Sequence, residues 1–81
     1  MINSMDEKIK TIIAEILSVD IEEITDDTVI GDLPEWDSLH QLHILDELEH
    51  FFSIKFTQEE LAELEDVSDL ISLVRDLQKT N

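Results

Sequence analysis

The chain is organised around the stretch Glu35-Trp36-Asp37-Ser38-Leu39-His40-Gln41-Leu42. Ser38 falls at the start of a predicted helix, directly after a carboxylate and close behind the only tryptophan. The helix is expected to run on to Phe52, which is about four turns at 3.6 residues each. A hydroxyl at a helix start is therefore the first candidate for a functional group.

Two faces of this helix differ in character when its residues are placed at about 100° each. One arc is apolar and is expected to face the core: Ile44, Leu45, Leu48 and Phe52. The opposite side is mixed and carries Leu39, His43, Asp46 and His50, with Leu42 at its flank. Apolar residues on the outer side of an acidic helix, close to the serine, predict a surface that other molecules contact.

Charge is strongly unbalanced in these 81 residues, with 21 Asp and Glu against 5 Lys and Arg and a formal net charge of −16. No Lys or Arg occurs between Thr11 and Ile54. Such a field repels nucleic acid phosphates and anionic membranes, and it attracts basic protein surfaces. We therefore expect protein partners with basic docking surfaces and no nucleic acid partner.

Cysteine is absent, which excludes disulfides and Cys-based zinc sites. No apolar run reaches the length of a membrane span or a signal-peptide core. The composition predicts a small monomeric domain without a membrane span, in the cytoplasm.

The first helix is predicted from Ser4-Met5-Asp6-Glu7, which has the pattern of a capping box. Apolar residues follow at helical spacing: Met5, Ile9, Ile12, Ile13, Ile16 and Leu17. From residue 18 to 37 the pattern predicts a long connection with a short helical turn at 19–24 and further turns at 25–28, Gly31 and Pro34. Its apolar residues are expected to attach it to the core: Ile21, Ile24, Val29, Ile30 and Leu33.

After the central helix, residues 53–56 are predicted as an extended link. Thr57-Gln58-Glu59-Glu60 is a second capping-box pattern, which opens a short helix with Leu61 and Leu64. A final helix is expected to be capped by Asp66 and to fray over residues 78–81, and its apolar residues are Val67, Leu70, Ile71, Val74 and Leu77. The predicted fold is an all-α bundle in a single domain over residues 1–81: three main helices, one short helix and a long loop after the first helix.

This arrangement resembles the acyl carrier protein family, whose attachment motif is similar to Asp37-Ser38-Leu39. The resemblance covers nearly the whole chain, because it includes the capped first helix and three further segments: Ile24-Thr25-Asp26-Asp27, Phe52-Ser53-Ile54 and Val67-Ser68-Asp69-Leu70-Ile71. It implies that Ser38 carries 4′-phosphopantetheine, added from coenzyme A by a phosphopantetheinyl transferase. It also implies that Asp37 assists the transferase, through a magnesium ion.

The resemblance further implies that the arm's terminal thiol holds an acyl or aminoacyl group as a thioester, and that the chain has no catalytic activity. Partner enzymes that load and process the acyl group are expected to contact the central helix through Leu39, His40, Leu42, His43, Asp46 and Glu47. Fatty acid, polyketide and related biosynthesis are the implied pathways. A phosphate at a helix N-terminus is also physically favourable, because free N–H groups and the helix dipole attract negative charge.

The chain departs from the family pattern at several positions. Pro34-Glu35-Trp36 replaces the glycine that many fatty-acid carriers have before the Asp-Ser pair. A tryptophan there also occurs in carriers of polyketide, aminoacyl and peptidyl pathways, so an aminoacyl or peptidyl carrier is an alternative. Histidines occupy positions 40 and 43, where carboxylates are usual, and Asp46 occupies a usually apolar position. These differences bear on which group the chain carries and which enzymes it binds, and not on the attachment site.

Other interpretations of the same residues are less favoured. In one of them, Ser38 is only a helix N-cap, with Gln41 as its capping-box partner. In another, the chain is an unmodified acidic protein that binds other proteins. His40, His43 and His50 offer pairs but no three-ligand metal site, so they are expected to be solvated. A Ser-His-Asp hydrolase is disfavoured because the side chains of Ser38, His40 and Asp37 are expected to diverge and no oxyanion hole is evident.

Overall fold

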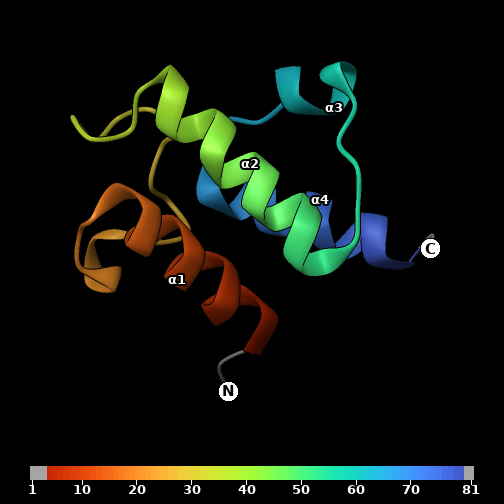
Figure 1. Cartoon of the computed structure of the whole chain (residues 1–81), viewed down its shortest axis with the longest axis horizontal. Coiled ribbons are helices and arrows are strands. Elements are labelled where there is room, and N and C mark those ends of the chain that lie inside the picture. The colour runs from red at the N-terminus through yellow and green to blue at the C-terminus, as the bar shows by residue number, and fades with distance from the viewer. Residues whose placement is uncertain (1–3, 80–81) are drawn as a thin grey trace.

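The computed structural model describes residues 4–79. All of its main elements are helices, and each contains apolar residues at helical spacing. The elements in chain order are α1 (Ser4–Leu17), the 3₁₀ helix η1 (Ile21–Glu23), α2 (Ser38–Phe52), α3 (Gln58–Ala62) and α4 (Val67–Lys79). The predicted all-α bundle is confirmed, with three main helices, one short helix and a long connection after α1 (Figure 1).

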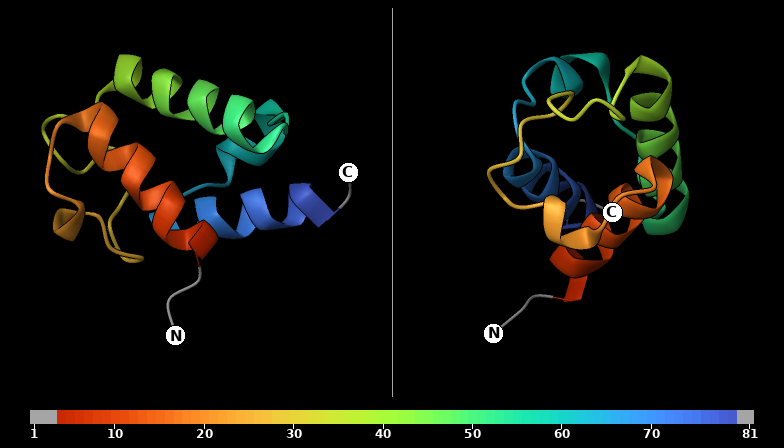
Figure 2. Two further views of the ribbon diagram at one scale, coloured as in Figure 1. Left: turned by 60° about the horizontal axis from the view of Figure 1, so that its bottom comes forward. Right: turned by 90° about the vertical axis from the view of Figure 1, so that its left-hand side faces the viewer.

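The core lies between α1, α2 and α4. In Figure 1, α2 runs diagonally across the molecule beside α1, and α4 passes behind it; the two views of Figure 2 show the same three helices enclosing the centre. The largest fully buried side chains come from these helices: Ile9, Ile13, Ile44, Leu48, Val67, Leu70 and Val74. The predicted inner arc of α2 is confirmed, because Ile44, Leu45 and Leu48 are buried and Phe52 packs against the core half-buried.

Side-chain hydrogen bonds mark the starts of α3 and α4 as the sequence predicts. Thr57 and Glu60 form the reciprocal capping box of α3. Asp66 Oδ1 accepts the Asp69 N–H at 2.9 Å and caps α4. At α1, however, Ser4 is already helical, and the residue before it lies outside the described residues. Leu64 lies beyond the end of α3, and α4 continues through Gln78 and Lys79; the last two residues of the expected frayed segment are not described.

The long connection is built from tight turns. The predicted helical turn is η1, and a hydrogen bond from the Thr28 N–H to the Thr25 carbonyl closes the next turn at 3.1 Å. Gly31 adopts a φ of +86°, a conformation that residues with a Cβ rarely take. Pro34 lies at the second position of a turn closed by the Trp36 N–H and the Leu33 carbonyl, where its fixed φ is favourable.

The expected apolar attachment of this connection is correct only in part. Ile24 is buried, and Ile30 and Leu33 pack against the core, but Ile21 and Val29 are 40% and 51% exposed. Backbone bonding explains Val29: it forms an isolated antiparallel bridge with Asp66, and in extended chain neighbouring side chains point to opposite sides. Ile30 therefore turns inward while Val29 turns outward. The additional anchor is Trp36, which is 3% exposed.

Candidate functional site

Ser38 is the first residue of α2, and its side chain is exposed. Asp37 precedes the helix in extended conformation, and its Oδ1 accepts the His40 N–H at 2.9 Å. Asp37 is therefore the N-cap, and the interpretation of Ser38 as a cap paired with Gln41 is wrong. Because a cap residue must be non-helical for its side chain to reach back to the helix, capping by Asp37 leaves the Ser38 hydroxyl available.

His40 makes a second contact with the same carboxylate. Its ring Nδ1 lies 2.7 Å from Asp37 Oδ1, so the expectation that these side chains diverge is wrong. They meet because residues three apart share one face of a helix. The pKa of Asp37 lies below its usual value, first because the His40 backbone N–H bonds the carboxylate and second because the His40 ring does. The carboxylate beside Ser38 is consequently held in its charged form.

A hydrolytic triad is not assembled at this position. Within residues 4–79, no hydrogen bond joins the Ser38 hydroxyl to His40 or to Asp37. The His-Asp pair therefore has no nucleophile in contact with it. Neither neighbour is therefore placed to activate the Ser38 hydroxyl.

Two backbone N–H groups at the start of α2 have no hydrogen-bond partner within residues 4–79. The Gln41 N–H bonds the Asp37 carbonyl and the His40 N–H bonds the Asp37 side chain, but the N–H groups of Ser38 and Leu39 have no partner among the described residues. Unpaired N–H groups and the helix dipole favour an anion at this end of α2. The donor set thus fits a phosphate ester on Ser38.

Trp36 anchors the loop that leads to Ser38. Its ring is buried, and its Nε1–H donates to Oε1 of Gln41 at 2.6 Å. The Gln41 side chain thus bonds Trp36 and is not a capping partner of Ser38. Sequence reasoning noted Trp36 without assigning it this role; the available signal was a lone large aromatic residue in an acidic loop, five positions before an amide on the next helix.

The outer face of α2 is exposed as predicted. Leu39 and Leu42 are 73% and 65% exposed, and His43, Asp46 and Glu47 are also exposed, while His40 is partly covered. Beside this face lies a groove of about 640 Å³ between α2 and the α3 region, lined by Leu39, Leu42, His43, Leu45, Asp46, Glu49, Phe56 and Leu61. The exposed leucines therefore lie on the wall of an apolar groove near Ser38.

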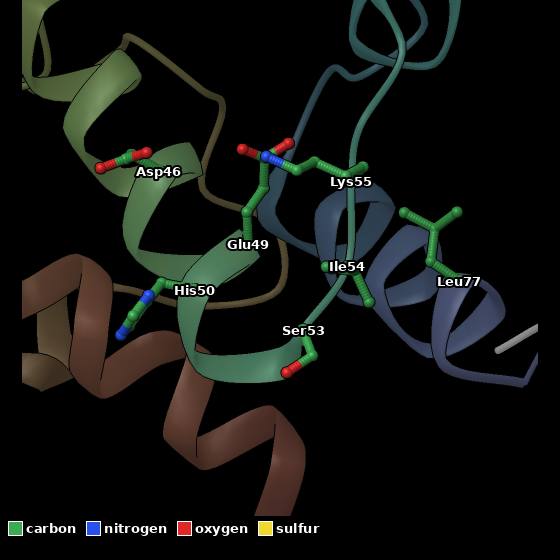
Figure 3. Close-up of a pocket in the computed structure, with 7 residues that line it drawn as sticks. All are labelled: Asp46, Glu49, His50, Ser53, Ile54, Lys55 and Leu77. Atoms are coloured by element: carbon green, nitrogen blue, oxygen red, sulfur yellow. The ribbon is translucent and has the colours of Figure 1, made fainter.

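A second hollow of about 590 Å³ lies at the other end of α2 (Figure 3). Its lining residues are Asp46, Glu49, His50, Ser53, Ile54, Lys55 and Leu77. One of its carboxylates is already engaged, because Glu49 Oε2 accepts the Phe56 N–H at 2.8 Å. No group of three or more His, Cys, Asp or Glu that could hold a metal ion occurs within residues 4–79. The residues of α2 that line this hollow begin at Asp46, so it lies toward the C-terminal end of the helix, away from Ser38.

Comparison with known proteins identifies the class. The model of the phosphopantetheine attachment site family matches residues 7–74, and the chain belongs to this family. Its fold matches the solution structure of the holo acyl carrier protein from Geobacter metallireducens, with a TM-score of 0.85 and 28% identity, over 96% of this chain and 90% of that one. The chain is therefore a phosphopantetheine-bearing carrier with the acyl carrier protein fold.

A second similarity is to a much larger protein. The non-reducing polyketide synthase dbaI of Emericella nidulans is 39% identical over 69 residues, which is 85% of this chain. The same match spans 3% of the synthase. The family is one of carriers that are modified by phosphopantetheinyl transferases and that serve biosynthetic enzymes. None of the helices within residues 4–79 has the length and apolarity needed to cross a membrane.

Proposed function

We propose that this chain is an acyl carrier protein whose 4′-phosphopantetheine is attached to Ser38, and that it presents acyl thioesters to enzymes of fatty acid, polyketide or related biosynthesis. The observation that carries the proposal is the placement of Ser38. It is exposed at the first position of α2 and follows a capping aspartate, within a chain whose family is defined by phosphopantetheine attachment.

The modification uses the chemistry of the helix start. Ser38 Oγ would form a bond to the coenzyme A phosphorus that bears the pantetheine arm, lose its proton to a base of the transferase, and displace adenosine 3′,5′-bisphosphate. The free N–H groups of Ser38 and Leu39 favour the resulting phosphodiester. Asp37, held ionised by its two bonds from His40, is suited to the metal-assisted contact with the transferase. When bound, the arm supplies the thiol that the cysteine-free chain lacks.

Partner enzymes are proposed to dock on the outer face of α2. Leu39 and Leu42 supply exposed apolar area, and Asp46 and Glu47 supply negative charge for basic partner surfaces. His40 and His43 complete the proposed contact set and reduce its acidity relative to a face of carboxylates. The polyketide assignment draws on the similarity to the synthase from Emericella nidulans, and the fatty acid assignment draws on the general fold.

Composition and the carrier family together support the remaining features of the proposal. A net charge of −16 opposes self-association, which supports a monomer. One domain over residues 1–81, a cytoplasmic location and the absence of catalytic activity complete it. The alternative from another class is an unmodified acidic interaction module, which would use the α2 face without attaching a group to Ser38. An aminoacyl or peptidyl carrier is the other alternative, because a tryptophan at the position of Trp36 occurs in such carriers as well as in polyketide carriers.

Intact mass spectrometry after incubation with coenzyme A and a phosphopantetheinyl transferase tests the proposal. One phosphopantetheine is expected per chain, and none on the Ser38→Ala variant. Ser68→Ala is a matched control, because Ser68 also lies in the first turn of a helix that an aspartate caps, and it is exposed. Modification that persists in Ser38→Ala, or that is lost in Ser68→Ala alone, would refute the assignment.

A further inference from the structure

Asp37 Oδ1 receives two hydrogen bonds from one residue. The His40 backbone N–H donates at 2.9 Å, as in any capped helix, and the His40 ring adds a bond at 2.7 Å. The torsion that rotates a carboxylate about its last bond is normally broad, so a single bond leaves its orientation loose. A second donor on the same oxygen restricts that rotation. Oδ2 takes part in neither bond.

The contact determines which ring nitrogen carries the proton. An ionised carboxylate can only accept hydrogen bonds, so Nδ1 of His40 must be the donor. In the neutral ring, Nε2 is then the acceptor. The pair is solvent-accessible, with 61% of the Asp37 side chain and 40% of the His40 side chain exposed. It can therefore meet an enzyme that approaches Ser38.

A carboxylate in place of His40 would remove the second hydrogen bond to Asp37. It has no proton to donate at neutral pH, and it would repel Asp37 across one turn of helix. The histidine replaces that repulsion with an attractive, charge-assisted bond, which is among the stronger hydrogen bonds in proteins. The start of α2 consequently presents one oriented carboxylate next to the hydroxyl.

From this geometry we infer that His40 is a positioning residue for phosphopantetheine transfer: its ring orients the Asp37 carboxylate beside Ser38 for the transferase. The inference rests on the proposed attachment at Ser38. His40 does not contact the reacting hydroxyl in the structure, so it acts through Asp37. Because Asp37 would engage the transferase during the transfer, loss of its orientation should lower kcat more than it raises KM.

Three substitutions separate the ring bond from the backbone cap. His40→Leu keeps the backbone N–H and removes the ring donor, and it is expected to lower kcat about three- to tenfold with KM for the carrier nearly unchanged. His40→Asn places an amide N–H near the position of Nδ1 and should restore most of the rate. His50→Leu is the matched control, because His50 lies on the same helix, is exposed, is outside the proposed contact set and does not bond Asp37.

Steady-state transfer of phosphopantetheine from coenzyme A, measured on the full chain with a single transferase, gives both constants. A kcat for His40→Leu equal to that of the parent would overturn the inference. So would a kcat for His40→Asn as low as that of His40→Leu, with both variants folded by circular dichroism. Ser38→Ala, assayed in parallel, distinguishes the two proposals, since its modification would refute the attachment site whatever the His40 variants show.

A spectroscopic measurement tests the contact independently of the transferase. Long-range ¹H–¹⁵N correlation spectra above neutral pH report which nitrogen of each histidine carries the proton. His40 is expected in the Nδ1–H form in the parent chain, and its signal should shift toward the Nε2–H form in Asp37→Ala while the His43 signal stays unchanged. A parent His40 in the Nε2–H form would overturn the inference.

Discussion

The indole nitrogen of Trp36 lies 2.6 Å from Oε1 of Gln41, and this bond joins the loop before Ser38 to α2. The ring itself is buried in the core. One residue thus connects the packing of the bundle with the position of Ser38, the proposed attachment serine, two residues later. Loss of this bond should be detected in the stability of the whole domain.

Gln41→Ala is expected to lower the free energy of unfolding by about 1–3 kcal/mol, because it leaves the buried indole N–H without a partner. Urea unfolding followed by the fluorescence of Trp36, the only tryptophan, measures the change. Glu47→Ala is the control, since Glu47 is exposed on the same helix and has a similar helix propensity. Equal stability of Gln41→Ala and Glu47→Ala would show that the bond does not anchor the loop.

The lowered pKa of Asp37 predicts how the cap depends on pH. The unfolded chain binds a proton at this group at higher pH than the folded chain does, so the contribution is present above the ordinary Asp pKa and is lost as pH falls through the folded value. Asp37→Asn should therefore melt at a lower temperature than the parent above about pH 5, and the difference should shrink as pH falls below that value. A difference that varies mainly between neutral and alkaline pH would contradict the assignment.

His43→Glu adds a negative charge to the proposed docking face without touching the Asp37–His40 pair. Enzymes that bind carriers through Lys and Arg should bind this variant more tightly, with a lower KM for the carrier that rises again with salt. Glu22→Gln, on exposed η1, provides a charge change away from α2. An unchanged KM for His43→Glu with such an enzyme would remove His43 from the contact set.

Self-repulsion should limit stability, because 21 acidic groups face only five basic ones. Among residues 4–79, Lys10 pairs with Asp26 at 2.7 Å and Arg75 with Asp6 at 2.8 Å, and Lys8 lies 4.6 Å from the centre of the Phe51 ring. Exposed pairs contribute little, about 0–1 kcal/mol each, so salt should screen more repulsion than attraction.

Sodium chloride is consequently expected to raise the melting temperature by several degrees, and magnesium or calcium chloride should do so at lower ionic strength. Calorimetry at fixed pH measures both effects. A melting temperature that falls with added salt would mean that the few ion pairs outweigh the repulsion.

The sequence by itself determined where the helices form and which face of α2 is buried. The spacing of apolar residues shows which side of each helix must face the core. Ile44 and Leu48 could be assigned to the core on that basis, and Thr57 and Asp66 could be assigned as caps from local patterns. The position of Ser38 at the start of α2 could also be predicted, because the residues of the motif Asp37-Ser38-Leu39 are consecutive in the sequence.

Only the tertiary structure decided the details around the serine. Whether Asp37 or Ser38 caps α2 depends on one backbone conformation, which local patterns allow at either residue. Val29 is exposed because its bridge to the distant Asp66 sets the direction of its side chain. Trp36 is buried, and its indole N–H bonds Gln41, five residues further along the chain. The contact of His40 with Asp37 depends in turn on which residue caps the helix. Of these contacts, only the Val29–Asp66 bridge joins distant parts of the chain; those of Trp36 and His40 depend on backbone conformations at the start of α2 that the sequence pattern leaves open.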